Sequence, residues 1–174
     1  MGTVNINAMS MVRQKQNTPW GNSTHLRFHM ETNASGVVLN SDLATALQAA
    51  DVIRLGEIPA GFLIEDALVN LSNAFSASST FHLGFLYTDG VDDASVPQDA
   101  QYICASLAAD ATSVSRKTGI KAPVQLPKPA WLVLTNNVAA QAVIGIIDVS
   151  VQGVDLGLSG GAPGYPSSAY PGTT

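Results

Sequence analysis

Two apolar runs rich in β-branched residues, joined by one short turn, constrain the fold of this chain more than any other feature. The segment Asp51–Ser72 reads DVIRLGEIPAGFLIEDALVNLS, with Pro59-Ala60-Gly61 between the runs. Proline presets the backbone for the first corner of a turn, and glycine tolerates the conformation that follows. The segment predicts a strand over Asp51–Ile58, a tight connection and a second strand over Phe62–Leu71. It holds no nucleophile motif, phosphate loop or metal spacing, so it reads as scaffold.

Alternating apolar and polar residues predict further half-buried strands. In His25–Glu31, the side chains of Leu26, Phe28 and Met30 face one way and the polar ones face the other. Within Phe62–Leu71, the pair Glu65-Asp66 interrupts the period, and a bulge there would re-aim the residues that follow. The other predicted strands are Gly36–Asn40, Thr80–Tyr87, Ala130–Thr135 and Ala142–Gln152.

Two segments favour short helices instead. Ser41–Ala50 begins with a capping serine or aspartate and places Leu43 and Leu47 at helical spacing. Pro97–Ala109 begins with a proline suited to a helix start and has a helix-favouring composition. Many short strands, turn signals at regular spacing and no βαβ rhythm together predict an all-β fold. The predicted architecture is a jelly-roll-like β-sandwich with one or two short helices and extended terminal arms.

The chain divides into an N-terminal arm (1–24), a β-sandwich domain (25–155) and a Gly/Pro/Tyr-rich C-terminal tail (156–174). The arm is polar and irregular, and its Trp20 is either a lid on the domain's own core or an anchor into a neighbour. The tail cannot build a core. Its Tyr165 and Tyr170 each precede a proline, and the tail is either a binding arm or plain disorder.

Charge is sparse and unevenly spread. Hydrophobic residues make up 46% of the chain and charged residues only 12%, against about 25% charged in typical domains. Residues 1–30 carry +3, residues 31–110 carry −10 and residues 111–174 carry +2, which sums to −5. A weakly charged surface suits a chain that partners cover, and an acidic body argues against nucleic-acid binding. No signal peptide and no membrane-length apolar run is visible.

No constellation for catalysis or metal binding emerges. The single cysteine, Cys104, lies among small and apolar neighbours and predicts a buried structural residue. On a strand, His25 and His29 would stand about 13 Å apart, too far to share a metal ion. Asp89, Asp92 and Asp93 crowd one loop without a calcium-loop spacing and predict solvated turn residues. The sequence therefore predicts no enzyme, no cofactor and no metal site.

The segment DVIRLGEIPAG, the strand Phe62–Leu71 after it and the later SSTFHLGFLYTDG resemble tailed-bacteriophage capsid decoration (cement) proteins. The resemblance covers Asp51–Gly90 well and Ala130–Val154 loosely. It implies a jelly-roll-like sandwich that oligomerises on the outside of an icosahedral shell and bridges neighbouring major capsid proteins. It also implies a virion protein made in the host cytoplasm, with no catalytic residues to carry over.

The resulting hypothesis is a non-enzymatic cement protein that self-associates as a dimer or trimer, without nucleic-acid or membrane partners. Its partner-binding residues would be Arg13, Trp20, Tyr165 and Tyr170, all in the two arms. The alternative is a carbohydrate- or receptor-binding jelly-roll head of a phage tail or fibre. Such a site requires exposed aromatic side chains near clustered acidic ones, and the candidate group is Tyr87 with Asp89, Asp92 and Asp93.

Overall fold

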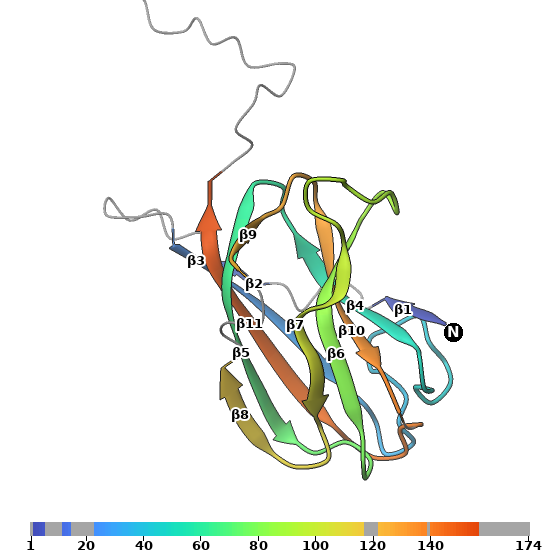
Figure 1. The fold of residues 1–174 in the computed structure, drawn as a ribbon. Helices are drawn as coiled ribbons and strands as arrows, with labels where there is room; N and C mark the ends of the chain where they lie inside the picture. The colour runs from blue at the N-terminus through green and yellow to red at the C-terminus, as the bar shows by residue number, and fades with distance from the viewer. Residues whose placement is uncertain (1, 6–11, 15–22, 117–121, 139, 157–174) are drawn as a thin grey trace, which may run out of the picture.

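The protein is a sandwich of two β-sheets packed face to face (Figure 1). This computed structural model describes residues 2–5, 12–14, 23–116, 122–138 and 140–156. The strands of these residues are β1 (Thr3–Asn5), β2 (Val12–Gln14), β3 (Ser23–Glu31), β4 (Val52–Ile58), β5 (Phe62–Asn73), β6 (Thr80–Tyr87), β7 (Asp99–Ala108), β8 (Ser113–Arg116), β9 (Val124–Gln125), β10 (Ala130–Asn136) and β11 (Ile146–Asp155). The predicted all-β sandwich is confirmed.

One sheet has the order β1-β4-β10-β6-β7, and the other has β2-β3-β11-β5-β8 with β9 also paired to β5. When the short strands β1, β2 and β9 are set aside, every connection except β6 to β7 crosses from one sheet to the other. The first and last of the remaining strands, β3 and β11, are antiparallel neighbours. This wrapping of the chain around a common core gives the jelly-roll-like sandwich that the strand pattern predicted.

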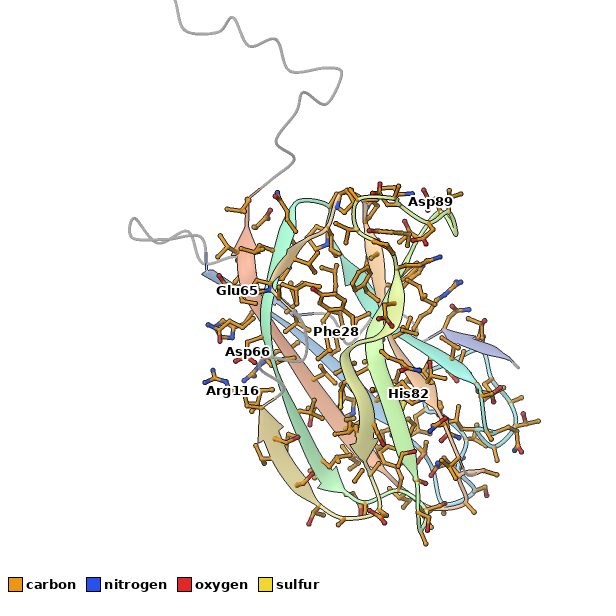
Figure 2. The ribbon with its side chains drawn as sticks, in the orientation of Figure 1. Phe28, Glu65, Asp66, His82, Asp89 and Arg116 are labelled. Atoms are coloured by element: carbon orange, nitrogen blue, oxygen red, sulfur yellow. The ribbon has the colours of Figure 1, made fainter. Side chains whose placement is uncertain are left out.

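The core lies between the two sheets and follows the predicted alternation. Leu26, Phe28 and Met30 of β3 point inward and are buried, as Figure 2 shows for Phe28. In β5 the register against β11 shifts between Gln152 and Gly153, so Glu65 is the extra, outward residue. The bulge predicted at Glu65-Asp66 is therefore confirmed, and it returns Ala67, Val69 and Leu71 to the core.

The turn at Pro59–Gly61 joins strands that belong to different sheets. β4 pairs with β1 and β10, whereas β5 pairs with β11, β8 and β9. Gly61 adopts a φ of 79°, a left-handed conformation that glycine accepts without strain, and its N–H donates to the carbonyl of Leu126 at 2.7 Å. The turn therefore carries the chain over one end of the sandwich, from one layer to the other.

The two predicted helices are wrong, because the described residues contain strands and turns but no helix. Pro97–Ala109 contains the edge strand β7, which pairs with β6 through two register shifts and buries Ile103, Cys104 and Leu107. Sheet pairing and burial override its helix-favouring composition. Ser41–Ala50 is a loop of turns and bends, with positive φ at Asn40 and Ala50 bracketing it.

Two predicted strand boundaries also shift. In Gly36–Asn40 only Val38 forms an isolated bridge, to Thr32. The final strand begins at Ile146 rather than Ala142 and runs to Asp155. The residues that precede it form a loop rather than part of the strand.

Within the predicted N-terminal arm, β1 adds in parallel to β4 and β2 adds in antiparallel to β3. Val4 of β1 is fully buried in the core, and the backbone N–H of Gly2 donates to Asp51 Oδ1 at 2.7 Å. Asn5 donates two hydrogen bonds to the Asp42 carboxylate. Residues 3–5 are therefore part of the folded domain. Residues 6–11, 15–22 and 157–174 lie outside the described residues.

Candidate functional site

The described residues hold no evident catalytic or metal centre, so surfaces are the candidates for function. No three His, Cys, Asp or Glu side chains among them gather closely enough to hold a metal ion. Cys104 is buried, as its sequence context predicted. None of them forms a helix long and apolar enough to cross a membrane. Three surface regions differ from the rest: two loops at opposite ends of the sandwich and one sheet face.

The first region is the acidic loop, residues 88–98 between β6 and β7. Its carboxylates accept hydrogen bonds from its own backbone: Asp89 from Val91 N at 2.9 Å and Asp92 from Gln98 N at 2.7 Å. Asp93 accepts from Ser95 N at 2.9 Å and from Val96 N at 3.3 Å. Such short-range bonds shape turns. The acids that crowd this loop serve its folding.

The hydrogen bonds within the acidic loop also lower the pKa values of two of its acids. The backbone N–H of Val91, followed by the Lys128 ammonium, holds the pKa of Asp89 below its ordinary value. The Ser95 hydroxyl and backbone N–H do the same for the pKa of Asp93. Lys128 Nζ lies 2.9 Å from Asp89 Oδ2 and 2.8 Å from the carbonyl of Val91, closing the loop from the β10 side.

Tyr87, the aromatic proposed for a sugar-binding group, is not available for stacking. Its side chain is buried, and its hydroxyl donates to the carbonyl of Val96 at 2.5 Å. Lys128 Nζ covers the ring at 4.8 Å from the centroid. Burial, followed by the negative charges of Asp93, Asp92 and Asp89, raises the pKa of Tyr87 to about 12. The group of Tyr87 with three acids therefore lacks the exposed aromatic that the carbohydrate-binding alternative requires.

The second region is the outer face of the sheet formed by β3, β11, β5 and β8. It carries a shallow hollow of about 440 Å³, and the side chains that line it include Arg27, His29, Leu68, Asn70, Asp148 and Ser150. Cross-strand polar contacts are found on this face: a hydrogen bond joins His29 Nδ1 to Asp148 Oδ1 at 2.8 Å, and an ion pair joins Arg116 Nε to Asp66 Oδ2 at 2.5 Å. Figure 2 shows Asp66 and Arg116 together on this side. These polar side chains are paired across strands, as in a solvated sheet face.

The histidines do not converge. His25 and His29 project from β3 on this face, whereas His82 lies on β6 in the other sheet (Figure 2). The Nδ1 atom of His82 and the Oγ1 atom of its cross-strand neighbour Thr135 are buried without a partner among the described residues. One histidine and one hydroxyl do not form a metal site.

The third region is the apolar loop, residues 137–138 and 140–145 between β10 and β11, at the end of the sandwich opposite the acidic loop (Figure 1). It contains no charged residue. Val138, Val143 and Ile144 are 56%, 39% and 44% exposed, and Leu39 of the neighbouring β3–β4 loop is 38% exposed. Of eight large apolar side chains exposed among the described residues, these four lie at one end. Connecting loops are usually polar, and clustered exposed apolar residues mark interaction sites.

A buried glutamine holds the apolar loop from beneath. Gln141 is 1% exposed; its Oε1 accepts from Ser76 N at 3.0 Å, and its Nε2 donates to Ser79 Oγ at 2.9 Å and to Asn136 Oδ1 at 3.1 Å. Its backbone N–H donates to the carbonyl of Leu47 at 2.8 Å. The loop is therefore tied to three other segments while its apolar side chains point outward.

Thr32 anchors the second half of the apolar loop. Its buried hydroxyl donates to the carbonyl of Val143 and accepts from the N–H of Gly145, each at 2.8 Å. A Cβ at Gly145 would stand 2.3 Å from the ring of Phe75, so glycine permits this close approach. The apolar side chains are consequently presented on a well-supported backbone.

The four predicted partner-binding residues fall at or beyond the limits of the described structure. Arg13 lies in β2, whose backbone pairs with β3 opposite Leu26. Trp20, Tyr165 and Tyr170 lie outside the described residues. The apolar loop was missed by the sequence analysis, which placed Ala142–Ile144 in a strand. The sequence does contain one indication of this loop, the uncharged run NNVAAQAVIG, which is longer than a connection between two strands needs to be.

No protein-family model and no curated protein matches this sequence. Two solved structures are similar in fold. One, titled "Capsid of Ralstonia phage GP4", contains a chain that aligns at a TM-score of 0.60 and 14% identity, over 88% of this chain and 98% of that one. The other, titled "Cyanophage Pam1 capsid asymmetric unit", aligns at 0.53 and 11% identity, over 85% and 95%. At these identities the likeness establishes the fold: the chain shares its β-sandwich with chains found in two phage capsid structures.

Proposed function

We propose that this protein is a non-enzymatic virion component that decorates and stabilises an icosahedral phage capsid by bridging neighbouring major capsid proteins. The single observation that carries the proposal is the fold likeness to chains of two phage capsids. Each alignment spans nearly all of the neighbour chain. The likeness is therefore of one whole sandwich to another, rather than to a domain inside a much larger shell-forming chain.

The charge distribution supports a place on the capsid exterior. Residues 31–110 carry a net charge of −10, and the whole chain carries −5. Packaged DNA presents a dense array of negative phosphates and repels an acidic surface. An acidic sandwich is therefore better suited to the outer surface of the shell, after synthesis in the host cytoplasm.

The terminal arms supply the proposed clamps. Arg13, Trp20, Tyr165 and Tyr170 would contact neighbouring capsid subunits, and the protein would act as a dimer or trimer. Many copies that each make modest contacts gain strength from avidity, because the second contact of a linked pair forms at high effective concentration. An arm can also add a strand to an exposed sheet edge, as β1 and β2 do within this chain.

The test is reconstitution on capsids of the phage that encodes the protein. Purified protein is mixed with particles that lack it, co-sedimentation measures binding, and cryo-electron microscopy locates the bound copies. The proposal expects saturable binding to the outer surface and greater resistance of the particles to heat or osmotic shock. Binding without any stabilisation, or density inside the shell, would contradict it.

The arm variants need care, because deletion of residues 1–24 would also remove the buried Val4 and the two added strands. Trp20→Ala and a chain ending at Leu156 leave the described strands intact. Each is expected to weaken capsid binding while the unfolding midpoint stays unchanged. Equal binding by both variants and by their combination would exclude the arms as clamps.

A further inference from the structure

We propose that the apolar loop, together with Leu39, is the surface that seats on the capsid, against an apolar patch of a capsid subunit that is flanked by lysine or arginine side chains. This inference rests on the proposed function and names the contact chemistry within it. Four of the eight exposed large apolar side chains of the described residues lie at this end. An exposed apolar cluster with a polar rim is the usual anatomy of a protein interface.

The backbone beneath this surface is fixed by contacts with neighbouring segments. Gln141, Thr32 and Gly145 tie the apolar loop to segments 32–47 and 75–79 through buried hydrogen bonds and one close ring contact. A loop already held in place loses little conformational freedom on binding, so its apolar contacts convert more fully into affinity.

The charges around the surface select the chemistry of the partner. The described residues that form this end of the sandwich include 31–51, 73–80, 108–113, 136–138 and 140–146, and these contain no lysine or arginine. Their acids are Glu31, Asp42, Asp51 and Asp110. Asp51 is buried and the charge of Arg54 in β4 acts on Asp42, so Glu31 and Asp110 are the acids that remain for a partner. Glu31 lies next to Leu39, whose N–H donates to its carbonyl, and Asp110 follows Ala109, which bonds both Phe75 and Ser79.

The acids Glu31 and Asp110 at the edge of this surface favour a partner with basic flanks and disfavour a second copy of the same end. Two copies that met through their apolar loops would each present the same acidic residues to the other. Like charges at an interface oppose association, whereas opposite charges accelerate it and set its orientation. The capsid subunit is thus the favoured occupant.

The experiment compares two sets of exposed apolar residues in the full-length protein. The test variant carries Val138→Ser, Val143→Ser and Ile144→Ser. The matched control carries Leu68→Ser, Val91→Ser and Leu156→Ser, which remove side chains that are 44%, 61% and 54% exposed and lie outside this end of the sandwich. Urea unfolding establishes that both variants remain folded, and co-sedimentation with capsids gives their affinities.

We expect the test variant to bind capsids at least about tenfold more weakly than the wild type, and the control to bind as the wild type does. A double variant, Glu31→Gln with Asp110→Asn, should weaken binding less and should reduce its dependence on salt. Capsid binding by the test variant equal to that of the wild type overturns the inference but leaves the proposed function standing.

The remaining outcomes are equally decisive. If the wild type itself does not bind capsids, the proposed function and this inference both fail. If analytical ultracentrifugation shows that the test variant loses a dimer which the control keeps, while capsid binding is unchanged, the occupant is a second copy and the inference is overturned.

Discussion

The two end loops of this sandwich are held in their conformations in different ways, one by its own acidic side chains and the other by residues outside it. The acidic loop folds on itself, because Asp89, Asp92 and Asp93 accept hydrogen bonds from backbone N–H groups within the loop. The apolar loop is held from outside, because Gln141 and the Thr32 hydroxyl bind it to the rest of the domain. The acidic loop forms its hydrogen bonds with its own side chains and needs few contacts with the rest of the domain. The apolar loop is held by hydrogen bonds to other segments, so its own side chains are not needed for its folding and can be apolar and exposed.

This difference predicts that the two loops respond unequally to the same perturbation. A change in the acidic loop should stay local, since few of its contacts extend beyond β10. A change beneath the apolar loop should affect the whole domain, since its anchors connect both sheets.

Two glycines with nearly the same backbone conformation provide the sharpest comparison. Gly36 has a φ of 75° beneath the apolar loop, and Gly90 has a φ of 71° in the acidic loop. A Cβ at Gly36 would lie 2.0 Å from the carbonyl oxygen of Gln141, whereas a Cβ at Gly90 meets nothing within 4 Å. Gly36→Ala should lower the free energy of unfolding by about 3 to 5 kcal/mol, and Gly90→Ala by about 1 kcal/mol.

Urea denaturation of both variants measures this difference. The cost of the left-handed conformation is common to the two sites, so the excess at Gly36 reports its contact with the apolar loop. Equal losses in the two variants would mean that the apolar loop yields readily, against the anchored arrangement described above.

Two glutamines offer the next comparison. Gln141→Met keeps the side-chain volume but leaves Ser76 N and Asn136 Oδ1 without these partners, and it should destabilise the domain by about 3 kcal/mol. Gln98→Met in the acidic loop removes the acceptor for Tyr87 N from a half-buried side chain, and should cost about 1 kcal/mol. Thermal or urea unfolding distinguishes the two, and a ranking in the opposite order would refute the contrast.

The strands and the bulge could be predicted from sequence because side-chain alternation is a local signal. Leu26, Phe28 and Met30 alternate with polar residues, and any sheet that buries one face must bury these three. The Glu65-Asp66 interruption likewise required an extra residue to keep Ala67 and Val69 inside. Neither inference depended on knowing the partner strand.

The errors arose where the outcome depends on partners distant in sequence. β7 reads as a helix from its alanine and leucine content, but it is an edge strand because β6 lies beside it. The apolar loop reads as the start of β11, because composition does not distinguish an apolar residue that is buried from one that is displayed. The hydrogen bonds of Gln141 to Ser76, Ser79 and Asn136 hold residues 140–145 in a loop rather than a strand, and these partners are distant or not evident in the sequence.

Tyr87→Phe tests how far the acidic loop depends on the rest of the domain. The change removes the hydrogen bond from the Tyr87 hydroxyl to the carbonyl of Val96 and keeps the buried ring, so it should cost about 1 kcal/mol. In an alkaline absorbance titration, the variant should also lose the tyrosine whose pKa burial raises to about 12. A loss as large as that of Gln141→Met would mean that the acidic loop is anchored after all.

Acid should loosen the acidic loop and spare the apolar loop. Hydrogen bonds hold the pKa values of Asp89 and Asp93 below their ordinary value of 3.8. Because these pKa values are depressed by folding, the carboxylate contacts contribute fully above pH 3.8 and are lost as the pH falls through the lower folded values. Both groups are exposed, so the effect is local.

Hydrogen exchange measured by NMR across this acidic range resolves the two loops residue by residue. The N–H groups of Val91, Ser95 and Val96 donate to carboxylates and should lose protection as the carboxylates are protonated. The N–H groups of Gln141, Ala142 and Gly145 donate to carbonyl or hydroxyl oxygens and should keep theirs, because residues 136–146 contain no titratable side chain. Simultaneous loss at both ends would show that acid unfolds the whole sandwich cooperatively, and that the two loops are not independent.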